Sequence, residues 1–207
     1  IYSQFGENYA PLEFKQDRYK FSYDAIKDKY LEDAKKTTTN DEFYALMMKF
    51  VAEFKDAHTS PALTNASLPD RAKVAFLGFN GIRHEDNLLV KSLLPTIAAD
   101  SKYPIKVGDK ITEINGKSLK DAVDAELIQY RNLGFDQANY SYHFNKLFNR
   151  VSTTNGLPKE TEVTLTIERA GKKRSVVMPW VVKDVVQFQK EQADATTKKT
   201  PPATDQD

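Results

Sequence analysis

The sequence predicts an α+β protein in which a small helical domain at the N-terminus precedes a region built mainly from β-strands. Three observations lead to this prediction. Apolar residues recur at helical spacing between residues 17 and 54. Short apolar segments separated by turn residues follow from residue 74 to residue 119. Residues 161–169 then alternate apolar and polar side chains with the period of two that a half-buried strand requires.

Two amphipathic helices are expected in the N-terminal part, one over residues 17–36 and one that ends near Phe54. Thr39 and Glu42 show the pattern of a capping box, in which their side-chain oxygens accept from backbone N–H groups at the helix start. We expect the two helices to pack as an antiparallel pair. The stripe residues assigned to the core are Tyr23, Ile26, Tyr30, Leu31, Ala34, Phe43, Leu46, Met47, Phe50, Val51 and Phe54.

The strand-rich region contains three short strands followed by a hairpin. The strands are predicted over residues 74–79, 87–94 and 110–114, and a tight turn follows at Asn115–Gly116, because both residues tolerate positive φ angles. Residues 120–131 and 136–150 have helical patterns. Residues 161–169 and 173–182 form the hairpin, with its turn at residues 170–172.

These patterns divide the chain into three parts. Residues 1–70 form the helical domain, and residues 59–70 are its connector to the next domain. Residues 71–183 form the strand-rich domain, which carries a helical insertion at about residues 120–158. Residues 184–207 have the polar, proline-containing composition of a linker or tail.

Composition excludes several function classes. The 207 residues carry a net charge of +1 and no long basic run, which argues against a nucleic-acid partner. No apolar stretch approaches the roughly 20 residues that span a bilayer. The chain has no cysteine, and its three histidines are scattered, so we expect no metal site and no cofactor. His84 is expected in a solvated turn, and His143 is expected to pack or to lie at the surface.

The segment from Val107 to Leu119, with the sequence VGDKITEINGKSL, resembles the Gly-Asp signature of bacterial PDZ domains. It combines a glycine turn, a strand with alternate apolar residues, an Asn-Gly turn and a helix start. The resemblance implies a PDZ-like, partly open β-barrel. In that family a single helix lies beside the ligand groove, so the longer insertion here is expected to cover or reshape the groove.

The same resemblance implies a peptide-binding loop. Leu77, Gly78, Phe79 and Asn80 lie where PDZ domains hold the C-terminal carboxylate of a peptide with backbone N–H groups. The peptide then adds as a strand to a sheet edge. The expected partner is therefore a polypeptide substrate or the C-terminus of a protein.

A helical domain, a short segment from Phe54 to Thr59 and then a PDZ domain together resemble the start of carboxy-terminal-processing and tricorn-like serine peptidases. The resemblance implies that His58 is the general base for a serine supplied by a downstream catalytic domain. It also implies a periplasmic or extracellular location. Asp56, two residues from His58, would point elsewhere on a helix, so we expect the acidic partner of the histidine, like the serine, to come from outside this chain.

The chain has no complete hydrolase signature of its own. It contains no Gly-x-Ser-x-Gly turn and no serine followed three residues later by lysine, so we expect it to be inactive by itself. Two alternatives stay open. In the first, the PDZ domain is a non-catalytic protein-binding module. In the second, the parent protein is a pseudo-peptidase without a nucleophile.

Overall fold

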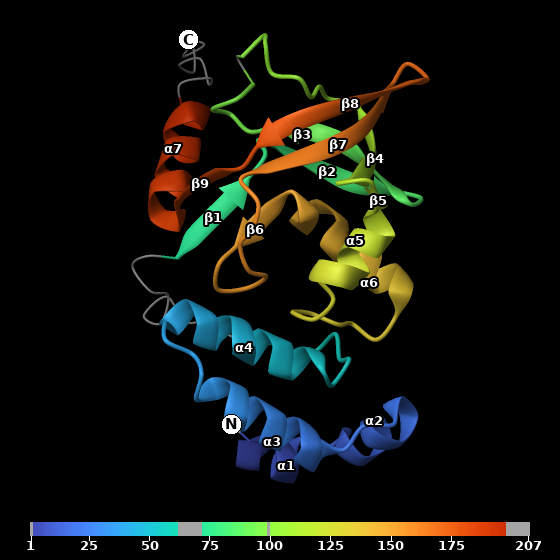
Figure 1. Cartoon of the computed structure of the whole chain (residues 1–207), viewed down its shortest axis with the longest axis vertical. Coiled ribbons are helices and arrows are strands. Elements are labelled where there is room, and N and C mark those ends of the chain that lie inside the picture. Colours follow the sequence, from blue (N-terminus) through green and yellow to red (C-terminus); the bar gives the residue numbers. More distant parts are fainter. Residues whose placement is uncertain (1, 62–71, 99, 198–207) are drawn as a thin grey trace, which may run out of the picture.

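The computed structural model describes residues 2–61, 72–98 and 100–197, and it confirms the α+β fold class. The N-terminal helices form one end of the molecule, and the strands and the remaining helices form the other (Figure 1). The N-terminal helices are α1 (Tyr2–Asn8), α2 (Leu12–Tyr19), α3 (Tyr23–Ala34) and α4 (Asn40–Ala52).

The helical domain is held together by an aromatic core. Phe50 and Phe54 are fully buried, and their ring centroids are 5.3 Å apart in an edge-to-face arrangement. The capping box is confirmed, since Thr39 accepts from the Glu42 N–H while the Glu42 side chain accepts from the Thr39 N–H. The expected helix over residues 17–36 is divided into α2 and α3, because Lys20 adopts a left-handed φ of 53°.

The second part contains two sheets, and neither is closed. One has the strand order β6-β1-β9, and the other has the order β2-β3-β4-β7-β8, with β5 beside β4. The strands are β1 (Lys73–Phe76), β2 (Phe79–His84), β3 (Asn87–Leu93), β4 (Lys110–Ile114), β5 (Lys117–Ser118), β6 (Asn149–Val151), β7 (Glu162–Arg169), β8 (Lys172–Pro179) and β9 (Val181–Asp184). Strand β4, the Asn115–Gly116 turn with positive φ at both residues, and the β7–β8 hairpin are confirmed.

The region between β5 and β7 differs from its prediction. After α5 (Leu119–Glu126), the expected helix over residues 136–150 is α6 (Asp136–His143), then a 3₁₀ turn at Phe144–Leu147, then strand β6. Asn149 lies opposite Phe76 in the ladder between β6 and β1, so pairing with a distant strand overrides the local helical pattern. We call residues 127–149, which follow α5, the insert.

The predicted strand over residues 74–79 is also divided. Gly78 has a φ of +95°, and the chain there leaves the sheet of β1 and enters the sheet of β2. Glycine adopts this backbone conformation without strain, which explains the break at this residue.

The segment after residue 183, predicted as a polar linker or tail, forms helix α7 (Val185–Thr197) in its described part. Phe188 packs against Phe76 of β1 with ring centroids 4.6 Å apart, so a short apolar stripe anchors this otherwise polar helix. The predicted connector lies mostly outside the described residues, as do residues 198–207. Within the described part, no helix is long and apolar enough to span a bilayer.

Candidate functional site

The predicted carboxylate-binding loop joins β1 to β2. Leu77, Gly78 and Phe79 are buried, and Asn80 is half-buried. The Leu77 N–H donates to the carbonyl of Phe148 at 3.2 Å. On the other side, the hydroxyl of Tyr103 donates to the Leu77 carbonyl, and a Cβ on Gly78 would lie 3.0 Å from the Tyr103 oxygen. The loop is therefore enclosed, and its binding of a ligand stays a prediction.

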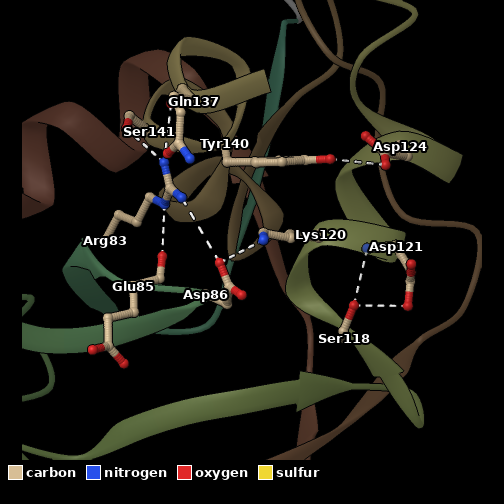
Figure 2. A network of polar contacts seen from close by, with 10 residues as sticks. All are labelled: Arg83, Glu85, Asp86, Ser118, Lys120, Asp121, Asp124, Gln137, Tyr140 and Ser141. Carbon is tan, nitrogen blue, oxygen red and sulfur yellow. Dashed lines mark hydrogen bonds and ion pairs between the residues drawn. The ribbon is translucent and has the colours of Figure 1, made fainter. Parts of the chain in front are cut away.

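The insert contacts β2 through a side chain of that strand. Arg83 of β2 donates from Nη1 to the Gln137 carbonyl at 3.1 Å and to Ser141 Oγ at 3.3 Å, both on α6 (Figure 2). The same guanidinium lies 3.8 Å from Asp86, which accepts from Lys120 of α5 at 2.6 Å. These contacts connect β2 with α6 and with α5.

Helix α6 is also bound directly to α5. The Tyr140 hydroxyl donates to Asp124 Oδ2 at 3.1 Å (Figure 2). At the start of α5, Ser118 Oγ accepts from the Asp121 N–H at 3.1 Å, which fixes the direction of the helix. Helix α6 is therefore hydrogen-bonded both to β2 and to α5, and the effect of the insertion on a peptide groove stays a prediction.

His58 lies on a short loop after α4, and its side chain is 98% exposed. The loop is not helical, since α4 ends at Ala52. Phe54 at its start is fully buried in the helical core. The loop therefore has a fixed base and presents the imidazole to solvent.

Asp56 lies closer to His58 than expected. Its Oδ1 accepts from the His58 backbone N–H at 2.9 Å and lies 3.6 Å from the ring nitrogen Nδ1. The expectation that Asp56 points elsewhere assumed a helix at this position, and the loop removes that assumption. Burial by itself would raise the pKa of Asp56, but hydrogen bonds from the Tyr9 hydroxyl and from His58 outweigh it and hold the pKa below its usual value.

The insert also holds the His58 loop, through hydrogen bonds to its backbone carbonyls. The guanidinium of Arg131 donates to the carbonyl of Ala57 at 2.6 Å and also to the carbonyl of Thr59. The two carbonyls flank His58 in the chain. The planar guanidinium has donors on separate nitrogens, so it can hold both carbonyls at once.

His143 of α6 in turn contacts Arg131. The ring is 1% exposed, and its Nε2 lies 2.6 Å from the Arg131 carbonyl. Burial lowers the pKa of His143 to about 4, so the ring is neutral at pH 7 and Nε2 carries the proton that the carbonyl accepts. His84, at the end of β2, is exposed as expected. Neither histidine belongs to the His58 loop.

The comparisons with known proteins agree with this architecture. The family model described as PDZ domain matches residues 66–132, so the chain contains a PDZ domain. The match ends before α6. No curated protein matches the chain.

Two solved structures share the fold over nearly the whole chain. Mature CPAF matches with a TM-score of 0.67 and 16% sequence identity, over 98% of this chain and 36% of that one. Mature CPAF complexed with lactacystin matches with a TM-score of 0.66 and 16% identity, over 98% of this chain and 37% of that one. The chain thus spans a little over a third of the length of these structures, and the likeness is one of fold.

The structure keeps the two predicted sites apart but joins both to the insert. Among the described residues, no hydrogen bond or ion pair links His58 to residues 77–80. The insert holds the His58 loop through Arg131 and the β2 edge through α6. The sequence reasoning missed Arg131, whose two acceptors lie 72 and 74 residues away in the chain. No local pattern could have indicated that contact.

Proposed function

We propose that this chain is the N-terminal and peptide-binding part of a serine endopeptidase. In this proposal the PDZ domain binds the end of a substrate polypeptide. His58 is the general base, and a further domain supplies the serine. The proposed location is the periplasm or the extracellular space, as for the peptidases that the chain resembles.

Two findings support a relation to proteases. The chain contains a PDZ domain, the type of domain that binds peptide C-termini. Its fold is similar to that of CPAF, which is a serine protease. The specific kind of peptidase, carboxy-terminal-processing or tricorn-like, is part of the proposal.

The observation that carries the catalytic part is the presentation of His58. An imidazole that serves a serine from another domain must be accessible and must also be held in place. The side chain is 98% exposed, whereas the backbone around it is fixed by Asp56 and by Arg131. The Asp56 carboxylate lies 3.6 Å from the ring nitrogen Nδ1, the nitrogen that the acidic residue of a serine-peptidase triad contacts.

The test uses the full encoded protein and a polypeptide substrate. We expect His58→Ala to lower kcat at least about 10²-fold, because general-base catalysis contributes that much or more. His84→Ala is the matched control, since His84 is another exposed histidine in the same chain. The kcat of the His84→Ala protein should equal that of the unchanged protein.

Two results would contradict the proposal. Undiminished turnover in the His58→Ala protein would show that the histidine is not the base. Absence of any peptide hydrolysis by the unchanged full protein would favour the non-catalytic binding module or the pseudo-peptidase.

A further inference from the structure

The outer edge of β2 is the edge to which a peptide would add. Strand β2 pairs with β3 on one side, and the Gly78 carbonyl accepts from the Leu94 N–H on that side. The Phe79 carbonyl and the Gly81 N–H point to the other side of the strand, where each binds a side chain of the insert. PDZ domains bind a peptide through such groups, by adding it as an extra strand.

Side-chain amides of the insert occupy this edge. Asn145 Oδ1 accepts from the Gly81 N–H at 2.9 Å. Asn149 Nδ2 donates to the Phe79 carbonyl at 3.2 Å. An asparagine side chain carries the same carbonyl acceptor and N–H donor as a peptide group. The two asparagines therefore make two of the bonds that an added strand would make, one to the Phe79 carbonyl and one to the Gly81 N–H.

A shared hydrogen-bond acceptor also orients the two asparagine side chains. Asn145 Nδ2 and Asn149 Nδ2 both donate to Asn80 Oδ1, at 3.3 Å and 3.4 Å. Asn149 Nδ2 additionally lies 3.3 Å from the Asn145 carbonyl. With its nitrogen directed at Asn80, the amide of Asn145 directs its oxygen at Gly81.

The contacts follow β2 in the direction expected for an antiparallel strand. Leu77 and Phe79 meet residues 148 and 149, Gly81 meets Asn145, and Arg83 meets residues 137 and 141. From Phe79 onward, residue numbers thus rise along β2 while they fall along the insert, from 149 through 145 to 141 and 137; the contact of Leu77 with residue 148 lies outside this order. The insert lies along the edge as a bound strand would, although α6 and the 3₁₀ turn are not extended.

We infer that the insert is a built-in occupant of the strand-addition edge, and that Asn145 and Asn149 exclude an incoming polypeptide until they are displaced. The partner that the edge fits is an extended polypeptide backbone with a free C-terminus. The inference rests on the peptide-binding part of the proposed function and is independent of the role of His58. It also gives a reason for the two asparagine contacts, because they satisfy the Phe79 carbonyl and the Gly81 N–H of a strand that lies at the end of its sheet.

Binding to an N-terminally fluorescein-labelled eight-residue peptide of alternating valine and serine, with a free carboxylate, tests the inference by fluorescence anisotropy. We expect the chain with Asn145→Ala and Asn149→Ala to bind at least about tenfold more tightly than the unchanged chain. Gln137→Ala is the matched control, because its exposed side chain lies on the insert and its hydrogen bond to Arg83 of β2 uses the backbone carbonyl, which the substitution keeps. The control should bind like the unchanged chain.

A second variant guards against a folding defect. Arg83→Ala removes the hydrogen bonds to α6 but keeps both asparagines, and it should also bind the peptide more tightly. Amide exchange adds a direct readout by NMR. The Gly81 N–H should exchange faster in the Asn145→Ala chain and should be protected again when the peptide is added to the double variant.

The outcomes separate the inference from the proposed function. Equal affinity of the unchanged chain and both variants would overturn the inference and leave peptide binding intact. Absence of binding by every variant would overturn the inference and the peptide-binding part of the proposed function together. Neither result depends on turnover, so a failure of His58 as a base would not affect them.

Discussion

Asp109, the acid of the Gly-Asp signature, has a structural role at the residue scale. Its side chain is 1% exposed and binds Arg169 through two hydrogen bonds, Nε to Oδ1 at 2.5 Å and Nη2 to Oδ2 at 2.6 Å. It also accepts from the Lys106 N–H at 2.8 Å. The carboxylate therefore ties the loop before β4 to the end of β7, and it keeps the strands of the larger sheet in place.

Replacement of Asp109 by asparagine should destabilise the protein. Burial by itself would raise the pKa of Asp109, but Arg169 and the Lys106 N–H outweigh it and hold the pKa below its usual value. We expect Asp109→Asn to lower the free energy of unfolding at pH 7 by about 1.5–3 kcal/mol, because it weakens hydrogen bonds to a charged partner that is itself partly exposed. Urea denaturation measures the difference.

The pH dependence of that difference follows from the direction of the pKa shift. A carboxyl with a lowered folded-state pKa stabilises the protein above its unfolded pKa of about 3.9, and the stabilisation is lost as the pH falls through the lower folded value. The gap between the two proteins should therefore shrink below about pH 4. A difference between the unchanged protein and Asp109→Asn that stays constant with pH would contradict the lowered pKa of Asp109.

Glu168→Gln is the control. It breaks the more exposed ion pair with Lys110 and should lower the free energy of unfolding by less than about 1 kcal/mol.

The sequence indicates those candidate site residues that a local motif marks, and it misses the candidates that the fold brings in from a distance. His58 and residues 77–80 follow from short segments. The role inferred for Asn145 and Asn149 depends on hydrogen bonds to residues that are 64 and 70 positions away in the chain. An asparagine within a helical pattern gives no signal that its amide will bind a strand edge.

At the scale of elements, prediction succeeds where the local pattern and the tertiary contacts agree. Strand β7 alternates apolar and polar residues, and the turn residues Ala170 and Gly171 of the β7–β8 hairpin both adopt positive φ, so turn and pairing favour the same register. The segment over residues 136–150 fails as a single helix because its last residues pair with β1. Helix α7 was missed because few apolar residues anchor it.

Helix α7 offers a test of how such a polar segment is held. Phe188→Ala should lower the free energy of unfolding by about 1–2 kcal/mol, less than a fully buried phenylalanine would cost, since Phe188 is half-buried against Phe76. Val186→Ala is the control, because Val186 lies on the same helix and is 70% exposed. Thermal unfolding followed by circular dichroism compares them. Equal melting temperatures would show that α7 contributes no packing energy through this face.

At the scale of the whole molecule, the helical domain and the PDZ domain meet at the His58 loop. Gly134 of the insert has a φ of +81°, and a Cβ there would lie 2.7 Å from the Lys55 carbonyl and 2.9 Å from the Tyr19 hydroxyl. Lys15 of α2 donates to the same carbonyl at 2.9 Å. Both domains thus contact the backbone that carries His58, and the loop belongs to their interface.

Arg131 should decide how firmly that loop is held. In the Arg131→Met chain the carbonyls of Ala57 and Thr59 lose their common donor, so we expect the His58 amide to exchange about tenfold faster, as the loss of hydrogen bonds worth about 0.5–1.5 kcal/mol each implies. Arg131→Lys should restore protection only in part, because a single ammonium replaces a fork with separate donor nitrogens. Arg174→Met is the matched control, since its guanidinium also binds a backbone carbonyl, that of Pro104, but far from His58 in the chain. Amide exchange followed by NMR distinguishes the three variants. If the His58 amide exchanges equally in the Arg131→Met and Arg174→Met chains, the helical domain alone fixes the loop, and the PDZ domain has no part in presenting the histidine.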